Sequence, residues 1–338
     1  MHPALISFVF GIIVSGGAIV DYPSYQNDHD NSKYHYDDPK SHGYPSPKSI
    51  WQPAVGTPYQ MILTGVIPDN TGTIQPAHIP IFDIDLFYTN KSAISTLHTQ
   101  GKKVICYFSA GSSEDWRPDY MDFPTADKGP CLNGWAGERY LNIRTQGVFN
   151  VMQKRIQLAA EKGCDAIDPD NVDGFSNENN FNLTANDAVT YIRKLANYAH
   201  ELGMGMGLKN VQTLLPRVMD VIQFAVNEEC ALVSGECDPY LDLVEAGKPV
   251  FHVEYASNYT TKDGKVVISG EGAEGLDSET LKRKLCLKRY PKLGKAFSTT
   301  IKTLNLNGWV LYCDDRWSET FTVPDGVKKG LKDCPDGN

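Results

Sequence analysis

The stretch Asp165-Ala-Ile-Asp168-Pro-Asp170-Asn-Val-Asp173-Gly-Phe175 places four aspartates within nine positions, directly after a short apolar strand signal. Ala166 and Ile167 are typical of the last buried residues of a strand. Pro169 predicts that strand pairing ends there, because proline has no N–H to donate. The acids therefore lie at the carboxyl end of a strand, where catalytic groups collect in α/β proteins.

Beyond residue 50, short apolar runs alternate with helical patterns. Helical spacing of apolar residues predicts helices over 148–162 and 185–202. Strands are predicted over 60–64, 81–87, 103–108, 164–168, 204–208, 221–226, 249–254 and 296–301, and the run 308–313 is an equally good candidate for the last one. Eight strands with intervening helices predict a (β/α)8 TIM barrel, an α/β fold, as a single catalytic domain over 51–338.

The first 50 residues do not resemble a domain. Residues 1–18 combine an apolar run with small residues and are typical of a secretory signal peptide. Residues 19–50 are rich in Tyr, Asp, His, Ser and Pro and predict a disordered linker or stalk. No later segment is long and apolar enough to span a bilayer. We therefore expect a secreted or cell-surface protein without an integral membrane domain after signal removal.

The eight cysteines agree with a secretory route, because an even number can pair completely. Cys230 and Cys237 enclose a short probable loop, which favours a local disulfide between them. Neither a Cys-x-x-Cys motif nor a histidine cluster occurs, so we expect no metal and no cofactor. Three sequons predict N-glycosylation at Asn90, Asn182 and Asn258.

The net charge excludes one class of partner. The chain has 32 basic and 41 acidic side chains, a formal net charge of −9. Nucleic-acid binding requires a basic surface, so a nucleic acid is not an expected partner. An acidic protein suits a neutral or cationic ligand.

Polar side chains occur at or near the ends of several predicted strands. They are Asp83, Asp85, Tyr107, the 165–173 aspartates, Lys209, Asn210, Asn227, Glu228, Glu229, Glu254 and Tyr255. A barrel gathers these ends into one mouth. Two carboxylates facing each other there suit glycoside hydrolysis, in which one protonates the leaving oxygen and the other attacks or activates water.

Four segments carry a resemblance to a known family. They are Val104-Ile-Cys-Tyr-Phe-Ser-Ala-Gly-Ser-Ser-Glu-Asp-Trp-Arg-Pro-Asp119, Gly163-Cys-Asp-Ala-Ile-Asp-Pro-Asp-Asn-Val-Asp-Gly174, Gly207-Leu-Lys-Asn210 and Phe224-Ala-Val-Asn-Glu-Glu-Cys230. In this order the chain resembles glycoside hydrolase family 114 over about residues 51–317. The resemblance implies a (β/α)8 endo-α-1,4-polygalactosaminidase that cuts galactosaminogalactan.

The resemblance also implies a catalytic acid after the fourth strand and another after the sixth. We assign Asp170 as the nucleophile and Glu228 as the general acid/base, and we expect a retaining two-carboxylate mechanism. Asp168 remains an alternative to Asp170, and Glu229 an alternative to Glu228, although strand alternation with Phe224 and Val226 favours Glu228. Further residues expected to line the sugar subsites are Asp85, Tyr107, Asp168, Lys209, Asn210, Glu254 and Tyr255.

The expected partner is a cationic galactosamine-containing polysaccharide, which an anionic cleft would attract. We expect the enzyme to act as a monomer. Two alternatives stay open at this point. The chain could be a non-catalytic glycan-binding barrel at the cell surface, or an α-galactosidase-like hydrolase of neutral galactosides.

Overall fold

The computed structural model describes residues 49–69, 72–270, 275–288, 291–326, 330 and 334. The predicted signal peptide at 1–18 and the predicted linker as far as residue 48 lie outside the described residues. Residues Ser49–Asn338 form one compact unit. Within the described ranges, no helix has both the length and the apolar character needed to cross a membrane.

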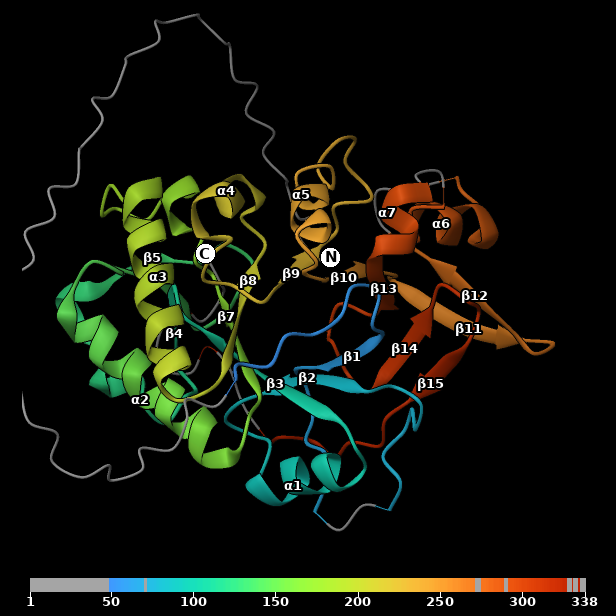
Figure 1. The fold of residues 1–338 in the computed structure, drawn as a ribbon, viewed down its shortest axis with the longest axis horizontal. Helices are drawn as coiled ribbons and strands as arrows, with labels where there is room; N and C mark the ends of the chain where they lie inside the picture. The colour runs from blue at the N-terminus through green and yellow to red at the C-terminus, as the bar shows by residue number, and fades with distance from the viewer. Residues whose placement is uncertain are drawn as a thin grey trace, which may run out of the picture. The chain divides into compact units, whose positions relative to one another are not determined.

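Eight parallel strands form the curled sheet at the centre of Figure 1, in their order along the chain. They are β1 (Tyr59–Ile62), β2 (Ile81–Asp85), β3 (Lys103–Ser109), β7 (Ala166–Asp170), β8 (Gly205–Lys209), β9 (Phe224–Glu228), β10 (Val250–Tyr255) and β13 (Phe297–Lys302). Lys302 joins the last of them to the first, donating to the Gln60 side chain at 3.0 Å and to the Met61 carbonyl at 2.6 Å. The predicted α/β barrel is confirmed.

Helices lie outside these strands (Figure 1). They are α1 (Lys91–Thr99), α2 (Gln146–Lys162), α3 (Ala185–Glu201), α4 (Leu215–Val218), α5 (Tyr240–Glu245), α6 (Ser278–Leu285) and α7 (Pro291–Ala296). Helix α3 begins with a capping box between Thr184 and Asp187, and α2 ends at Gly163 with a positive φ of 96°. Both helices match their sequence predictions closely because caps and apolar periodicity agree.

Shorter strands and 3-10 turns lie in the connections between the barrel strands. The connection from β3 to α2 contains a three-stranded sheet, and a hairpin follows β10. These strands are β4 (Ser112–Glu114), β5 (Lys128–Cys131), β6 (Glu138–Leu141), β11 (Asn258–Lys262) and β12 (Lys265–Ser269). Short 3-10 turns span Tyr120–Asp122, Thr125–Asp127, Gly174–Ser176 and Gln212–Leu214.

Two strand predictions are refined by the structure. The fourth strand does not end before Pro169 but continues to Asp170. Its pairing with β8 stops at Ile167, so the missing proline N–H interrupts no ladder on that side. At the other end of the chain, β13 is the eighth parallel strand. The alternative candidate, residues 308–313, forms β14 (Trp309–Tyr312). This strand pairs antiparallel with β13 and with β15 (Trp317–Glu319).

Apolar side chains fill the barrel interior. This cluster contains Tyr59, Met61, Ile81, Ile105, Ala166, Phe224, Val226, Phe251, Val253 and Leu306. Gly207 is required beside Phe224, because a Cβ atom at that position would lie 2.4 Å from the phenyl ring. Full burial of a side chain such as Phe224 contributes about 1.5–3 kcal/mol.

All eight cysteines form disulfides, and the predicted Cys230–Cys237 pair is present. The other pairs are Cys106–Cys164, Cys131–Cys334 and Cys286–Cys313. The Cys106–Cys164 bond ties β3 to Cys164, two residues before β7 begins. It therefore braces the two strands that carry Tyr107 and Asp170.

Candidate active site

Three neighbouring strands end in ionisable residues that face the barrel interior. These are Asp170 of β7, Lys209 of β8 and Glu228 of β9. The residue after each has a positive φ: 60° at Asn171, 53° at Asn210 and 63° at Glu229. Asparagine adopts this left-handed region more readily than most residues, which explains two of the three positions. The chain therefore turns sharply after each ionisable group and leaves its side chain at the mouth of the barrel.

Lys209 connects the two predicted catalytic carboxylates. Its buried ammonium lies 3.0 Å from Asp170 Oδ2 and 3.2 Å from Glu228 Oε2. Burial alone would lower the pKa of Lys209, but the charges of Asp170, Glu228 and Asp168 outweigh it and hold that pKa well above its usual value. Lys209 is therefore a permanent cation between two carboxylates.

Each carboxylate also accepts a hydrogen bond from a tyrosine. Tyr107 donates to Asp170 Oδ2 at 2.8 Å, and Tyr255 donates to Glu228 Oε1. Burial raises the pKa of both phenols well above the usual value, and the neighbouring carboxylate raises each further. Both tyrosines consequently remain protonated donors at any physiological pH.

Asn171 holds the second oxygen of Asp170, a role that the sequence did not reveal. Its backbone N–H donates to Asp170 Oδ1 at 2.7 Å. Its side-chain amide donates to Ser109 at 2.9 Å and to Ser112 at 3.2 Å. Gly111 permits this approach, because a Cβ atom there would lie 1.6 Å from the Asn171 carbonyl oxygen. An asparagine directly after a strand-end aspartate is the signal that could have indicated this role.

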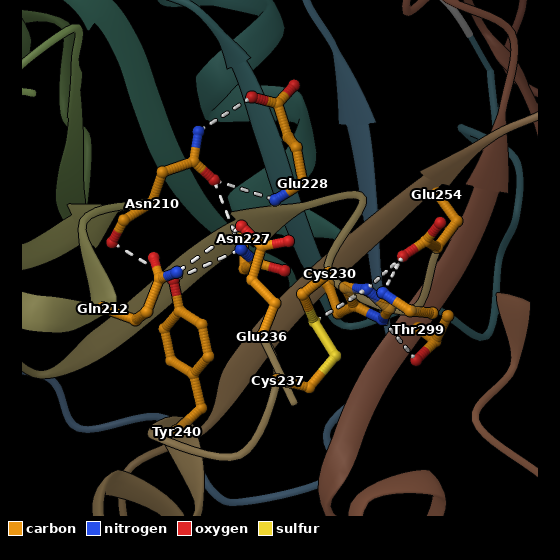
Figure 2. The surroundings of a disulfide bond; sticks show 12 residues. Asn210, Gln212, Asn227, Glu228, Cys230, Glu236, Cys237, Tyr240, Glu254 and Thr299 are labelled. Carbon is orange, nitrogen blue, oxygen red and sulfur yellow. Dashed lines mark hydrogen bonds and ion pairs between the residues drawn. A yellow bond between two sulfur atoms is a disulfide. The ribbon is translucent and has the colours of Figure 1, made fainter. Parts of the chain in front are cut away.

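Asn210 holds Glu228 in a similar way (Figure 2). Its amide nitrogen donates to Glu228 Oε2 at 3.2 Å, and its amide oxygen accepts a bond of 2.9 Å from the Glu228 N–H. Tyr240 donates to the Asn210 carbonyl at 3.1 Å and anchors the turn. The expected position of Asn210 near the acids agrees with this geometry.

Strand alternation separates the alternative acids. Asp168 and Asp170 share the inward face of β7, but Asp168 lies two residues deeper and is 0% exposed. Burial raises the pKa of Asp168 to about 7, although Lys209 acts in the opposite direction. On β9, Glu228 continues the inward face of Phe224 and Val226, whereas Glu229 lies beyond the strand. Asp170 and Glu228 are therefore the acids at the rim.

Two of the expected subsite residues, Asp85 and Glu254, are bound by residues outside this group. Asp85 is 2% exposed, and its oxygens accept bonds of 3.1 Å and 2.7 Å from Arg117. Glu254 is 0% exposed and lies on the opposite face of β10 from Tyr255. There it contacts His252 at 2.8 Å beside the Cys230–Cys237 disulfide, as Figure 2 shows. Asp85 is therefore bound by Arg117 and Glu254 contacts His252, and both acids are buried.

Other expected features are placed as follows. The three sequon asparagines, Asn90, Asn182 and Asn258, are all exposed, as glycosylation requires. Glycosylation at these positions stays a prediction. Among the described residues, Cys230, Cys237 and His252 come within the spacing of a metal-ligand set. Their two sulfur atoms are joined in a disulfide, which removes the thiolates that a metal would require.

Comparison with known proteins agrees with this architecture. Ega3 of Aspergillus fumigatus, solved in complex with galactosamine, is 42% identical, with a TM-score of 0.68 over 78% of this chain and 98% of that one. The glycoside hydrolase domain of PelA from Pseudomonas aeruginosa shares the fold, with 12% identity and a TM-score of 0.51 over 74% of this chain and 96% of that one. A search of curated proteins gave no match.

The family profile gives the broadest match. Residues 40–318 match glycoside-hydrolase family GH114. This range contains the whole ring of parallel strands and all the residues around Lys209. The barrel, the paired carboxylates and this match agree, and the chain therefore belongs to glycoside-hydrolase family GH114.

Proposed function

We propose that this family GH114 glycoside hydrolase cleaves α-1,4-linked galactosamine polymer, galactosaminogalactan, at internal bonds. The observation that carries the proposal is the pair of rim carboxylates, Asp170 and Glu228, held around one lysine ammonium. The substrate class is supported by 42% identity to a protein solved with galactosamine. Paired carboxylates are the chemical groups that glycosidic bond cleavage requires.

In this proposal Asp170 is the nucleophile. Its carboxylate attacks the anomeric carbon while Glu228 protonates the departing glycosidic oxygen, which leaves a glycosyl ester on Asp170. A water molecule, deprotonated by Glu228, then attacks the same carbon and releases the sugar. Hydrogen bonds from Tyr107 and Asn171 support the role of Asp170, because they hold both of its carboxylate oxygens in place.

The spacing of the two acids favours retention of configuration. Because one ammonium contacts both, Asp170 Oδ2 and Glu228 Oε2 are no farther apart than the 3.0 Å and 3.2 Å contacts added together. Carboxyl groups of inverting enzymes are usually about 6.5–9.5 Å apart, whereas those of retaining enzymes are about 5–5.5 Å apart. This upper limit on the oxygen–oxygen distance supports the retaining arrangement.

Lys209 couples the two steps. While Asp170 is ionised, the ammonium is neutralised mainly by the nucleophile. Once Asp170 becomes an ester it has no charge, and the same ammonium then favours the ionised form of Glu228. Glu228 is thereby changed from an acid into the base that the second step needs.

The substrate's own charge suits this site. Galactosamine units without acetyl groups are cationic near neutral pH, and the chain carries a net charge of −9. An acidic cleft would concentrate such a polymer and hold it less strongly as salt rises. We expect the enzyme to act as a monomer.

Secretion or display at the cell surface is the expected location. All eight cysteines are paired, which suits an oxidising compartment. The exposed sequon at Asn258, at the start of the β11–β12 hairpin, suits passage through a secretory pathway.

The direct test is incubation of the purified protein with galactosaminogalactan. Release of oligosaccharides of intermediate length, detected by mass spectrometry, is expected from internal cleavage. Asp170→Asn protein should bind the polymer but release no fragments. Binding without release by the unaltered protein would instead indicate a glycan-binding barrel, and turnover of a chromogenic α-galactoside alone would indicate a hydrolase of neutral galactosides.

A further inference from the structure

Two carboxyl groups inside the barrel have no role in the scheme above. Asp83 of β2 and Asp168 of β7 are each 0% exposed. None of their four carboxylate oxygens accepts a hydrogen bond from any other described residue. Both side chains face the interior, where Ile105 and Tyr107 of the intervening β3 occupy the matching register positions. Burying a charge without a partner costs a large amount of free energy. At least one of these two carboxyl groups is therefore expected to be protonated.

We infer that Asp83 and Asp168 share a single proton and together present one negative charge to Lys209 from inside the barrel. Sharing one proton leaves one buried charge in place of two, which lowers the free-energy cost of burying two carboxyl groups that have no other partners. The inference rests on the proposed function, because Lys209 is the cation between Asp170 and Glu228. The pair faces Lys209 from the deeper side, and the two rim carboxylates contact it at the mouth.

The electrostatics agree with this geometry. Burial raises the pKa of Asp83 well above its ordinary value, and the charge of Asp168 raises it further. Asp168, with a pKa of about 7, is therefore the member that ionises near neutrality. The ionisable groups that face the pair from the surrounding strands are Tyr59, Tyr107, Asp170, Lys209 and Glu228.

The shared charge gives Lys209 a fixed counterion throughout the reaction. Asp170 loses its charge when the glycosyl ester forms, and Glu228 has none while it carries the proton. The pair keeps its negative charge both before and after the glycosyl ester forms. It therefore holds the Lys209 ammonium in the same position throughout the reaction. Asp83 and Asp168 are thus positioning residues that act through Lys209.

Asp83→Asn tests the shared proton without any substrate. In the unfolded chain both aspartates ionise near pH 4, whereas the folded pair retains protons above that pH. The pair's contribution to the free energy of unfolding therefore falls as pH rises. The amide of D83N mimics the protonated acid at every pH, so the stability of this variant should fall less as pH rises. We therefore compare the melting temperature of D83N minus that of the unaltered protein at the two pH values. This difference should be more positive at pH 8 than at pH 5 by at least ~3 °C.

The matched control is Asp263→Asn, in the exposed turn between β11 and β12. Its melting temperature should follow that of the unaltered protein at both pH values, and its activity should be unchanged. Infrared spectra at pH 8 provide a second measurement. The unaltered protein should show the carbonyl band of a buried protonated acid, and D83N should lack it. An equal shift of D83N at both pH values, or the absence of this band, would overturn the shared proton.

The link to Lys209 has its own measurement. The double variant D83N/D168N has lost the deeper charge, so its kcat should fall at least ~10-fold with KM changed less than ~2-fold, the pattern of a lost transition-state interaction. D83N alone should lose less. An unchanged kcat in the folded double variant would overturn the positioning role. If the unaltered protein cleaved no polymer, the proposed function would fail, whereas the melting and infrared experiments would still decide the shared proton.

Discussion

The side-chain amide of Asn210 contacts Glu228 twice, donating to Oε2 at 3.2 Å and accepting from the backbone N–H at 2.9 Å. One residue therefore fixes both the side chain and the backbone of the proposed acid/base. Since Asn210 follows Lys209 directly, the cation and this amide are positioned by the same turn.

Asn210→Ala should loosen Glu228 without removing its carboxyl group. We expect kcat to fall roughly 10-fold, because small misplacement of a catalytic group can lower rates by up to about 100-fold. Asn210→Asp should in addition place a second negative charge beside Glu228 and move the pH optimum of the variant upward. A pH–rate profile of both variants measures this. Identical profiles for the two variants would contradict a direct contact with Glu228 during catalysis.

Asp170→Asn and Glu228→Gln should each lower turnover by about 100-fold to 10,000-fold, the loss expected for a positioned proton-transfer or nucleophilic group. Initial rates of oligosaccharide release, with circular dichroism to verify folding, are the measurement. Glu229→Gln is the matched control, because Glu229 lies beyond β9. Greater loss in E229Q than in E228Q would reverse the assignment of the acid/base.

Lys209→Met should leave two carboxylates facing each other without their shared cation. Without the cation the two negative charges repel each other, so the acidic limb of the pH–rate profile should move to higher pH. We expect kcat to fall on the order of 100-fold, similar to the loss of one charge-stabilising group. Lys262→Met, in the exposed hairpin, is the control for removing a lysine charge. A pH profile of K209M that matches K262M would disprove the electrostatic role.

The proposed attraction between polymer and cleft should depend on salt and on acetylation. Raising ionic strength from about 0.01 M to 1 M shortens the screening length from about 30 Å to 3 Å. KM for deacetylated oligomers should therefore rise, while KM for fully acetylated oligomers should change little. Kinetics on both substrates at both salt concentrations measure this. A preference for the acetylated chain that ignores salt would refute the attraction.

Gly111→Ala should destabilise the fold and disturb the site together. The added Cβ would lie 1.6 Å from the Asn171 carbonyl oxygen, so the segment after Asp170 must shift. We expect the free energy of unfolding to fall by at least ~1–3 kcal/mol, with reduced kcat. Gly72→Ala is the control, because nothing lies within 4 Å of its added Cβ. Denaturant unfolding of the two variants distinguishes a local clash from a general effect of alanine.

Much of the barrel could be predicted from local pattern. Apolar runs marked each parallel strand, and the helices α2 and α3 were recognisable from periodicity. The misplaced end of the fourth strand has a specific reason. Pro169 usually interrupts a strand, but its neighbour β8 stops pairing at Ile167, which only the assembled sheet reveals.

The candidate site was predicted less completely. Tyr107, Lys209 and Tyr255 contact Asp170 or Glu228, because alternation along parallel strands directs them inward. Asn210 reaches Glu228 from the turn after β8. Asp85 is beside Tyr107 in the strand register but is bound by Arg117, which comes from a later segment of the chain. Glu254 faces away from the site on β10, where it contacts His252 of the same strand.

The sequence by itself determined the family, the order of the strands and the presence of acids at their carboxyl ends, since these depend on residue type and spacing along the chain. Only the tertiary structure decided which acids meet. It placed Asp170 at the rim and Asp168 beneath it, set Lys209 between two carboxylates, and joined Cys131 to Cys334 across the chain. The physical reason is that proximity, burial and charge compensation depend on strands distant in sequence, whereas periodicity is a local property.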